Sequence, residues 1–323
     1  MNDGQIVSRK KVVVFGGGTG LSCLLSGLKL FPIDVTTIIT VSDNGSSTGV
    51  LKEELDIPAV GDVGKVLLSM AGNDEDLINL LQYRFSKDGS LQNHPVRNIL
   101  LAALIDIKGN LTEATRYMSK LLDINGTVLP LTEEKVDLIG KGKTPGNDYF
   151  GEEEVSAHIR DIDRITYDHK ISVSDEVKGK IKEADLIIFS PGSLYTSILP
   201  HLLSDDIIDA IEDGHAPLMY VSNLVTQPGE TDGYNVSDHI ATLDKYLGNH
   251  KIDIVIANNE RIDDRIVNKY ITTENKTLVV CDREKLGGLK VIEGDIFSID
   301  DQGRIRHDPL KTAYIIFSYL MRQ

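Results

Sequence analysis

Residues 12–20 read VVVFGGGTG, in which an apolar run leads directly into four glycines within five positions. The apolar run predicts a buried strand, because strands that are covered on both faces are apolar throughout. The glycines from Gly16 to Gly20 free the backbone, so that its N–H groups can converge on a phosphate at the start of a helix. Thr19 adds a hydroxyl group. This stretch predicts an α/β fold with a phosphate-binding loop after the first strand, with a tight turn that binds nothing as the alternative.

Short β-branched runs and helical patterns alternate along most of the remaining chain, which is typical of β-α-β units and a parallel sheet covered on both faces. Further strands are predicted at 35–42, 185–190, 218–222 and 252–257, with weaker ones at 278–280 and 289–292. Helices are predicted at 21–30, 63–71, 74–85, 97–107, 112–122, 195–203, 205–212, 237–247, 263–270 and 310–321.

The alternation of strand and helix patterns stops between about residues 125 and 175, where several glycines and Pro145 interrupt it. Short runs at 128–131 and 161–167 there indicate hairpin strands. About 50 residues make only a marginal core by themselves. We therefore expect a small β-rich insertion within a single nucleotide-binding α/β domain that spans 1–323.

The composition restricts the kind of ligand. The chain has 34 Lys and Arg residues against 49 Asp and Glu, and a formal charge of −15. Nucleic acid and anionic bilayers need a positive surface field, so neither is an expected partner. A small anionic ligand would be held by backbone N–H groups and a few local cations such as Arg306, and Tyr270 is placed to stack on a base.

Cys23 and Cys281 are the only cysteines and form no C-x-x-C pair, which argues against zinc and favours two buried structural thiols. No apolar stretch reaches the length of a signal peptide or a membrane helix. These features predict a cytoplasmic protein.

Three familiar motifs fit poorly. The dinucleotide pattern G-x-G-x-x-G would require glycine where Leu21 stands, and a Walker loop would require Ser or Thr where Val66 stands. The pattern G-x-S-x-G surrounds Ser47, but a nucleophile elbow also needs a dedicated His and Asp pair. A nicotinamide enzyme, a Walker-type enzyme and an esterase are therefore all disfavoured.

Two further polar loops follow predicted strands and should open at the same carboxyl edge of the sheet as the glycine loop. The first contains Asp43, a candidate for a ribose or sugar hydroxyl or for Mg²⁺, and Asn44, which with the nearby serines can complete the hydrogen bonding. A plain Asx turn is the alternative. The second contains Gly192, which frees the backbone, and Ser193, which can cap a helix. Two such loops suit a nucleotide diphosphate sugar.

Other polar side chains extend the predicted site. The amides of Asn223 and Gln227 can read the edge of a base, since each offers a donor and an acceptor. His94 could donate to an anion, and Arg97 has the forked geometry that phosphate prefers. A solvated helix cap explains His94 and Arg97 equally well.

Five segments, taken in order, carry a family resemblance: GGGTGLS, SDNGSS, GDVGKVLLSMAG, SPGSLYTSILPHLL and NLVTQPGETDGYNVSDHI. The chain resembles the gluconeogenesis-factor (YvcK-type) family, which is related to the CofD-type 2-phospho-L-lactate transferases. The resemblance implies a Rossmann-like three-layer α/β/α fold and a cytoplasmic protein that binds UDP-sugars and supports cell shape and wall synthesis during gluconeogenic growth. In the CofD branch it implies Mg²⁺-dependent transfer of a phospholactyl group from a nucleotide-activated donor to a deazaflavin alcohol.

The chain departs from the family pattern in two segments. GDVGK at 61–65 replaces GDIRN, without the Arg-Asn pair, and NHPVRN at 93–98 replaces GHSxGN, without the glycines. Asp62 remains, and together with Asp43 it could hold Mg²⁺ under the transferase alternative. Features that bind a deazaflavin are not identified. The branch without turnover, which requires no cofactor, is therefore favoured.

The expected partner is a nucleotide sugar or another phosphorylated nucleotide, and a homodimer stays open. The predicted metal ligands, under the transferase alternative only, are Asp43 and Asp62. The predicted ligand-binding residues are Gly16, Gly17, Gly18, Thr19, Gly20, Asp43, Asn44, Ser46, His94, Asn98, Gly192, Ser193, Leu194, Asn223, Thr226, Gln227, Gly229, Tyr270 and Arg306.

Overall fold

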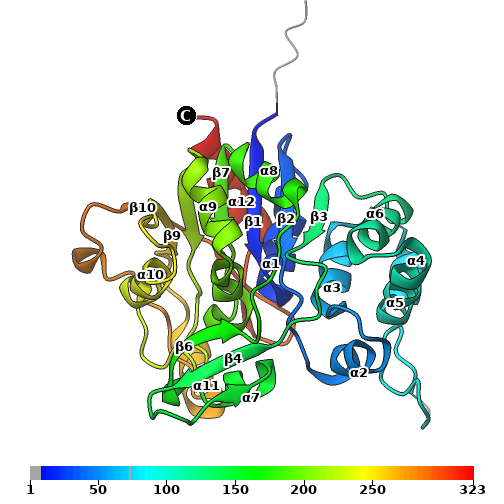
Figure 1. The fold of residues 1–323 in the computed structure, drawn as a ribbon. Helices are drawn as coiled ribbons and strands as arrows, with labels where there is room; N and C mark the ends of the chain where they lie inside the picture. Colours follow the sequence, from blue (N-terminus) through cyan, green and yellow to red (C-terminus); the bar gives the residue numbers. More distant parts are fainter. Residues whose placement is uncertain (1–8, 73, 87) are drawn as a thin grey trace, which may run out of the picture.

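The computed structural model describes residues 9–72, 74–86 and 88–323, and a sheet of seven strands lies at its centre (Figure 1). Every neighbouring pair of strands in this sheet is parallel, which confirms the predicted α/β fold. In spatial order the strands are β10 (Lys290–Gly294), β9 (Ile254–Asn258), β8 (Leu218–Val221), β7 (Leu186–Phe189), β1 (Lys11–Gly16), β2 (Asp34–Ile39) and β3 (Thr127–Pro130).

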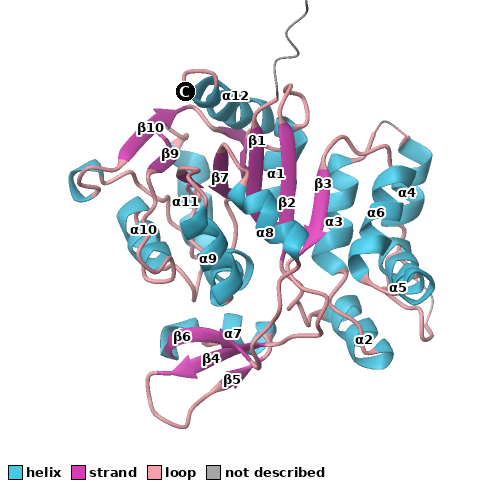
Figure 2. Cartoon of the chain, turned by 45° about the horizontal axis from the view of Figure 1, so that its top comes forward, coloured by secondary structure: helices cyan, strands magenta, loops and turns pink. Residues whose placement is uncertain are grey.

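Helices cover both faces of this sheet (Figure 2). On one face α1 contacts α3 and α12, and on the other α8 contacts α9, so the fold has three layers. Within the described part of the chain, no helix is both long and apolar enough to cross a bilayer. The helices are α1 (Gly18–Leu28), α2 (Ser46–Leu55), α3 (Gly61–Met70), α4 (Glu75–Gln82), α5 (Val96–Lys108), α6 (Leu111–Leu121), α7 (Glu152–Ala157), α8 (Asp175–Lys182), α9 (Asp205–Asp213), α10 (Val236–Asp244), α11 (Asp264–Glu274) and α12 (Pro309–Leu320), with short turns η1 (Ile159–Asp161), η2 (Leu194–Ile198), η3 (Leu199–Leu203) and η4 (Arg283–Lys285).

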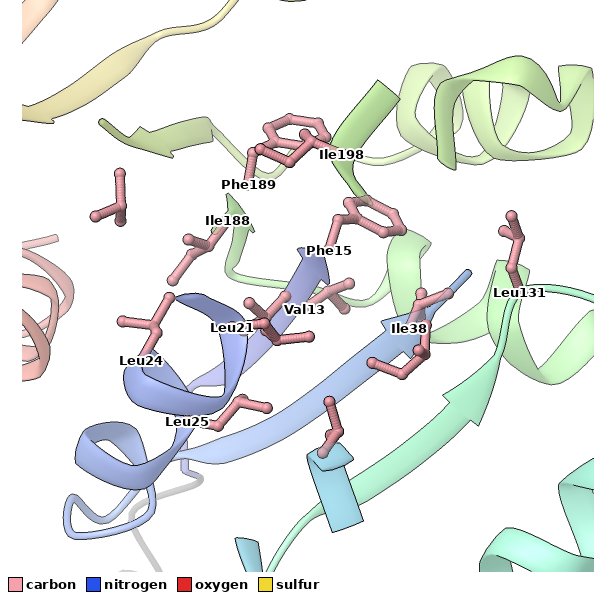
Figure 3. Close-up of a cluster of buried hydrophobic side chains, with 14 of the residues drawn as sticks. Val13, Phe15, Leu21, Leu24, Leu25, Ile38, Leu131, Ile188, Phe189 and Ile198 are labelled. Atoms are coloured by element: carbon pink, nitrogen blue, oxygen red, sulfur yellow. The ribbon is translucent and has the colours of Figure 1, made fainter. Parts of the chain in front are cut away.

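The centre of the core lies where β1 and β7 pair, and Figure 3 shows the side chains that fill it. Phe15 of β1 and Phe189 of β7 stack, with their ring centroids 5.5 Å apart. Leu21, Leu24 and Leu25 are fully buried on one face of α1, at the spacing of an amphipathic helix. Each such side chain stabilises the fold by about 1.5–3 kcal/mol. The core thus holds the start of α1 firmly against the strands that precede both predicted phosphate loops.

The strand order reverses between β1 and β7. In an open α/β sheet, this reversal leaves a crevice outside the carboxyl ends of the strands, and ligands bind there. The glycine loop follows β1, and residues 190–193 follow β7. Both loops therefore flank the crevice.

The β-rich insertion forms a small antiparallel sheet of its own, in the order β5 (Tyr149–Phe150), β4 (Leu138–Gly142) and β6 (Ile162–Tyr167). Figures 1 and 2 place it, together with α7, beyond the carboxyl ends of the parallel strands. The hydroxyl of Tyr167 donates to the carbonyl oxygen of Pro200 at 3.0 Å, which ties the insertion to η3. The insertion therefore lies next to the carboxyl edge of the main sheet.

Two strand predictions were wrong. Residues 128–131 were expected in a hairpin, but β3 is the parallel edge strand of the main sheet, because α6 returns the chain to the side of β2. Residues 278–280 form no strand and make only a single bridge, between Leu278 and Val225. A separate hairpin of β11 (Phe297–Ile299) and β12 (Ile305–His307) was not predicted.

Two helical regions also differ from the prediction. The polar loop that contains Asp43 and Asn44 ends at Gly45, so the nearby serines Ser46 and Ser47, expected in this loop, already belong to α2. The single helix expected at 195–203 is divided into η2, which has a wide π-helical turn, and the tighter η3. Pro200 explains the break, since proline has no N–H group to continue the helical hydrogen bonds.

Candidate functional site

A cavity of about 320 Å³ opens at the crevice between β1 and β7. Five chain segments that are distant in sequence line it: the glycine loop with the start of α1, the loop after β7, the loop after β8, the segment after α11, and β12. Its lining residues are Gly17, Gly18, Thr19, Gly20, Cys23, Pro191, Gly192, Ser193, Ser197, Asn223, Leu224, Val225, Thr226, Gln227, Lys276, Ile305, Arg306 and His307. The structure thus brings together ten of the predicted ligand-binding residues.

The glycine loop presents the N-terminus of α1 to this cavity. The helix begins at Gly18, three residues earlier than the pattern predicts, and Gly17 before it provides no side-chain cap. The first N–H groups of a helix have no partner within the helix, and they carry the positive end of its dipole. Gly18 has a φ of +64°, which favours glycine. The loop is therefore suited to an anion.

Glycine is also required where the loops after β1 and β7 touch. A Cβ atom at Gly20 would overlap the carbonyl oxygen of Pro191, and a Cβ at Gly16 would overlap the hydroxyl of Ser190. Part of the glycine pattern thus serves close backbone packing. Gly16 itself does not line the cavity.

Asn223 connects the loop after β8 to the loop after β7. Its Oδ1 accepts a hydrogen bond from the Gly192 N–H, and its Nδ2 donates to the Gly192 carbonyl oxygen, both at 2.9 Å. We expected this amide to read a base, but both of its polar atoms are already used. Asn223 therefore positions the two loops relative to each other.

Positive charge in the cavity comes from Lys276 and Arg306. Lys276 Nζ donates to Glu274 at 2.6 Å, and the Arg306 side chain is 44% exposed, 3.7 Å from an oxygen of Asp300. His307 adds no charge at neutral pH, because burial lowers its pKa to about 4. An anion in this cavity would therefore meet two cations in addition to the N–H groups of α1.

Cys23 lies beside these groups. Its thiol donates to the carbonyl oxygen of His307 at 3.1 Å, and burial raises its pKa to about 11. Cys23 and Cys281 are both free and partly buried, rather than fully buried as we expected.

The loop after β8 offers one unused polar atom. Oε1 of Gln227 is buried and has no hydrogen-bond partner among the described residues, so it can accept from a ligand. Thr226, in contrast, accepts a hydrogen bond from the Thr277 N–H. The Ser193 hydroxyl donates to the carboxylate of Glu230 at 2.8 Å. Gln227 is thus the better candidate for base or sugar recognition.

Carboxylates gather on the other side of the glycine loop. Asp43 accepts from the N–H of Gly45 at 2.8 Å through Oδ1, in the Asx turn considered as the alternative. Asp62 accepts from Lys65 at 2.8 Å. A Cβ at Gly17 would lie 2.7 Å from Asp62 Oδ2, so Asp62 lies against the glycine loop.

Glu152 from the insertion joins these carboxylates, although it was not among the predicted site residues. Burial raises its pKa to about 8, with further increases from the charge and hydrogen bonding of Asp43 and from the charge of Asp62. Its carboxyl group is therefore mostly protonated at neutral pH. No three His, Cys, Asp or Glu side chains in the described ranges are placed to hold a metal ion together. Mg²⁺ commonly uses one or two carboxylates with substrate phosphates and water, which Asp43 and Asp62 fit.

Several predicted residues lie outside the cavity. Asn44 and Ser46 line a separate groove between α2 and the antiparallel sheet. His94 is buried, and its Nδ1 lies 2.9 Å from the Ser47 hydroxyl, to which Asn98 donates at 3.3 Å. These contacts fasten α2 to the start of α5.

The remaining predicted residues serve the framework. Tyr270 is only 4% exposed, and its hydroxyl accepts a hydrogen bond from the Ile305 N–H at 2.7 Å. It therefore holds the strand that carries Arg306 and is not placed to stack on a base. Leu194 is fully buried at the start of η2, and Gly229 lies in the turn beyond Gln227 without lining the cavity.

Comparisons with known proteins identify a family, relatives and a solved structure that this chain resembles. The chain matches the family described as 2-phospho-L-lactate transferase CofD over residues 12–297. It is 39% identical to the putative gluconeogenesis factor of Thermotoga maritima over 311 residues, which cover 95% of this chain and 98% of that protein. It is also 39% identical to the gluconeogenesis factor of Bacillus subtilis over 315 residues, with coverages of 97% and 98%. A crystal structure of a Bacillus halodurans protein has a TM-score of 0.90 at 38% identity, covering 96% of this chain and 100% of that one.

Proposed function

The chain belongs to the CofD family and, within it, to the gluconeogenesis factors, and on that basis we propose that it is a nucleotide-sugar-binding protein without turnover. The ligand is a UDP-sugar, and the bound protein supports cell shape and wall synthesis in the cytoplasm of cells grown on gluconeogenic carbon sources. The glycine loop and the loop after β7 bind its diphosphate. Gln227 contacts the base or the sugar.

One observation carries this proposal: the N-terminus of α1, Lys276 and Arg306 converge on one cavity in a chain whose net charge is −15. A diphosphate needs several N–H donors and local cations, and helix N-termini are common phosphate sites. The cavity volume of about 320 Å³ lies within the usual range for small-molecule sites. Gln227 Oε1, which is buried without a partner, supplies an acceptor for a ligand N–H or hydroxyl.

Calorimetric titration with UDP-glucose and UDP-N-acetylglucosamine in the presence of EDTA tests the proposal. The wild-type protein should bind without metal, and Arg306→Gln should weaken binding about tenfold, since one charged contact to phosphate is lost. Arg304→Gln is the matched control, because Arg304 lies just before β12, pairs with Asp300 and does not line the cavity. Equal effects of the two substitutions, or no binding at all, would contradict the proposal.

The carboxylate cluster favours a second candidate, a CofD-type Mg²⁺-dependent phosphotransferase. Asp43 and Asp62 would hold the ion, which would neutralise charge on a phosphoryl donor. Burial is the main cause of the raised pKa of Glu152, and the charges of Asp43 and Asp62 raise it further. A cation held by these two carboxylates would relieve that second contribution. Incubation with a guanosine-activated phospholactate donor, a deazaflavin alcohol and Mg²⁺ distinguishes the two functions. Product formed only with Mg²⁺, and lost in Asp62→Asn, would establish the transferase and exclude the protein without turnover.

A further inference from the structure

Arg97 is a buried cation without a visible counter-ion. The residue is 7% exposed, and its Nε is completely buried without a hydrogen-bond partner. No ion pair of Arg97 is found among the described residues, and Asp62, the carboxylate whose charge acts on it, pairs with Lys65. Burying an unpaired charge is costly, and a guanidinium stays protonated at neutral pH. A chain with 49 acidic residues could easily supply a partner, so an unpaired arginine at this place calls for another explanation.

The surroundings of Arg97 make room for it and add positive charge. A Cβ atom at Gly64 would lie only 3.1 Å from Arg97 Cδ, so the missing side chain at Gly64 allows the arginine to pack against α3. Arg84 is close enough for its charge to lower the pKa of Arg97, and it donates to the carbonyl oxygen of Asn93 at 2.6 Å rather than to a carboxylate. Arg84 also forms a backbone bridge with Pro95, two residues before Arg97, so the two arginines lie near each other and form a cationic pair.

The nearest negative charge does not cancel this pair. Asp62 raises the pKa of Arg97, but its Oδ1 already accepts from Lys65 Nζ at 2.8 Å. Asp43 also acts on Lys65, so three cations, the two arginines and Lys65, face two carboxylates, and an excess of positive charge remains. In an otherwise acidic protein, this excess is the chemistry of an oxyanion site, because the fork of a guanidinium matches carboxylate and phosphate oxygens.

The cationic pair adjoins the nucleotide cavity through α3. Asp62 touches the glycine loop at Gly17, and Gly64 touches Arg97. The side chains at positions 62 and 64 leave α3 in different directions, because residues two apart in a helix do not face each other. Asp62 nevertheless lies close enough to Arg97 for its charge to raise the pKa of that arginine. A ligand group that extends past Asp62 from the glycine loop therefore approaches the guanidinium of Arg97.

We propose that Arg97 and Arg84 bind an oxyanion, a carboxylate or a phosphoryl group, beside the diphosphate cavity. This inference rests on the proposed function, which it deepens: the nucleotide sugar carries a second acidic group on its sugar. The same oxyanion chemistry could belong to a separate small anion that binds together with the nucleotide sugar, and the experiment separates these two sources.

The test uses two ligands that differ only in one carboxylate, UDP-glucose and UDP-glucuronic acid. The wild-type protein should bind UDP-glucuronic acid at least tenfold more tightly, and Arg97→Gln should remove this preference while changing the Kd of UDP-glucose less than twofold. Arg97→Lys should restore part of the preference, since it keeps the charge but loses the fork. Arg261→Gln, an exposed arginine paired with Asp264, is the control.

A second measurement keeps the inference independent of nucleotide binding. Inorganic phosphate alone should raise the melting temperature of the wild-type protein, and Arg97→Gln should reduce this increase, because only the glycine-loop cavity can then still bind phosphate. If phosphate binds through Arg97 but the two UDP-sugars bind equally well, the oxyanion is a separate molecule. If no UDP-sugar binds at all, the proposed function fails while the phosphate measurement still decides the oxyanion site. An unchanged response of Arg97→Gln to phosphate and to both sugars would overturn the inference.

Discussion

Replacing Glu152 by Gln should make the protein more stable, by an amount that grows with pH. Burial and the neighbouring carboxylates raise the pKa of Glu152 from 4.5 to about 8 in the folded protein. The folded state therefore keeps a proton that the unfolded state releases once the pH exceeds about 4.5. Raising the pH through this window favours the unfolded state, and the effect is complete above about pH 8.

The two pKa values set the magnitude. At about 1.4 kcal/mol per pKa unit, the difference between 4.5 and about 8 corresponds to at most about 5 kcal/mol above pH 8, and to nothing below pH 4. Glutamine keeps the shape and a hydrogen-bond donor but has no proton to lose. Glu152→Gln should therefore match the wild-type protein at pH 4.5 and exceed it by a few kcal/mol at pH 8.5.

Urea denaturation at pH 4.5, 5.5, 6.5, 7.5 and 8.5 measures this difference. Glu154→Gln is the control, because Glu154 belongs to the same helix and is exposed, so it removes the same charge without the burial. A stability difference for Glu152→Gln that does not change with pH would refute the reasoning. The same pH dependence in Glu154→Gln would refute it as well, because it would assign the effect to overall charge.

Three shorter predictions concern the cavity. Gly20→Ala should lower the free energy of unfolding by at least about 2 kcal/mol in a urea titration, because its Cβ would overlap the Pro191 carbonyl oxygen. Gly18→Ala should lower it by about 1–2 kcal/mol, because of its positive φ alone. An equal or smaller loss for Gly20→Ala would contradict the close approach of the two loops. Asn223→Ala should lower the free energy of unfolding by about 1–3 kcal/mol and weaken UDP-sugar binding in calorimetry. An unchanged affinity would show that the loops keep their positions without Asn223. Cys23 has a pKa of about 11, so mass spectrometry should show that it reacts slowly with iodoacetamide at pH 7. The rate should rise about tenfold per pH unit up to pH 9. A bound nucleotide sugar should make the reaction slow again.

Local patterns allowed much of the fold to be predicted. The apolar run at 12–15 forms β1, and the glycines that follow it allow α1 to start against the loop after β7. Such features depend on neighbours in sequence. The position of β3 could not be derived in this way, because an edge strand and a hairpin strand have the same short apolar pattern, and only the path of α6 decides between them.

Side-chain roles were harder to predict than loop positions. Gln227 and Arg306 line the cavity, but the side-chain amide of Asn223 is already hydrogen-bonded to Gly192. Glu152 was missed, because its significance comes from Asp43, more than a hundred residues earlier in the chain. Long-range pairing of this kind leaves no periodic signal in the sequence.

The reversal of strand order between β1 and β7 also has a consequence for protein synthesis. The strands on one side of it belong to the first 130 residues, and those on the other side to residues after 185. A nascent chain on the ribosome thus exposes the glycine loop long before Gln227 and Arg306 exist. The cavity is complete only when β12 has been made. Chains that stop before β12 would therefore lack the cavity, so that ligand occupancy distinguishes chains that contain β12 from shorter fragments.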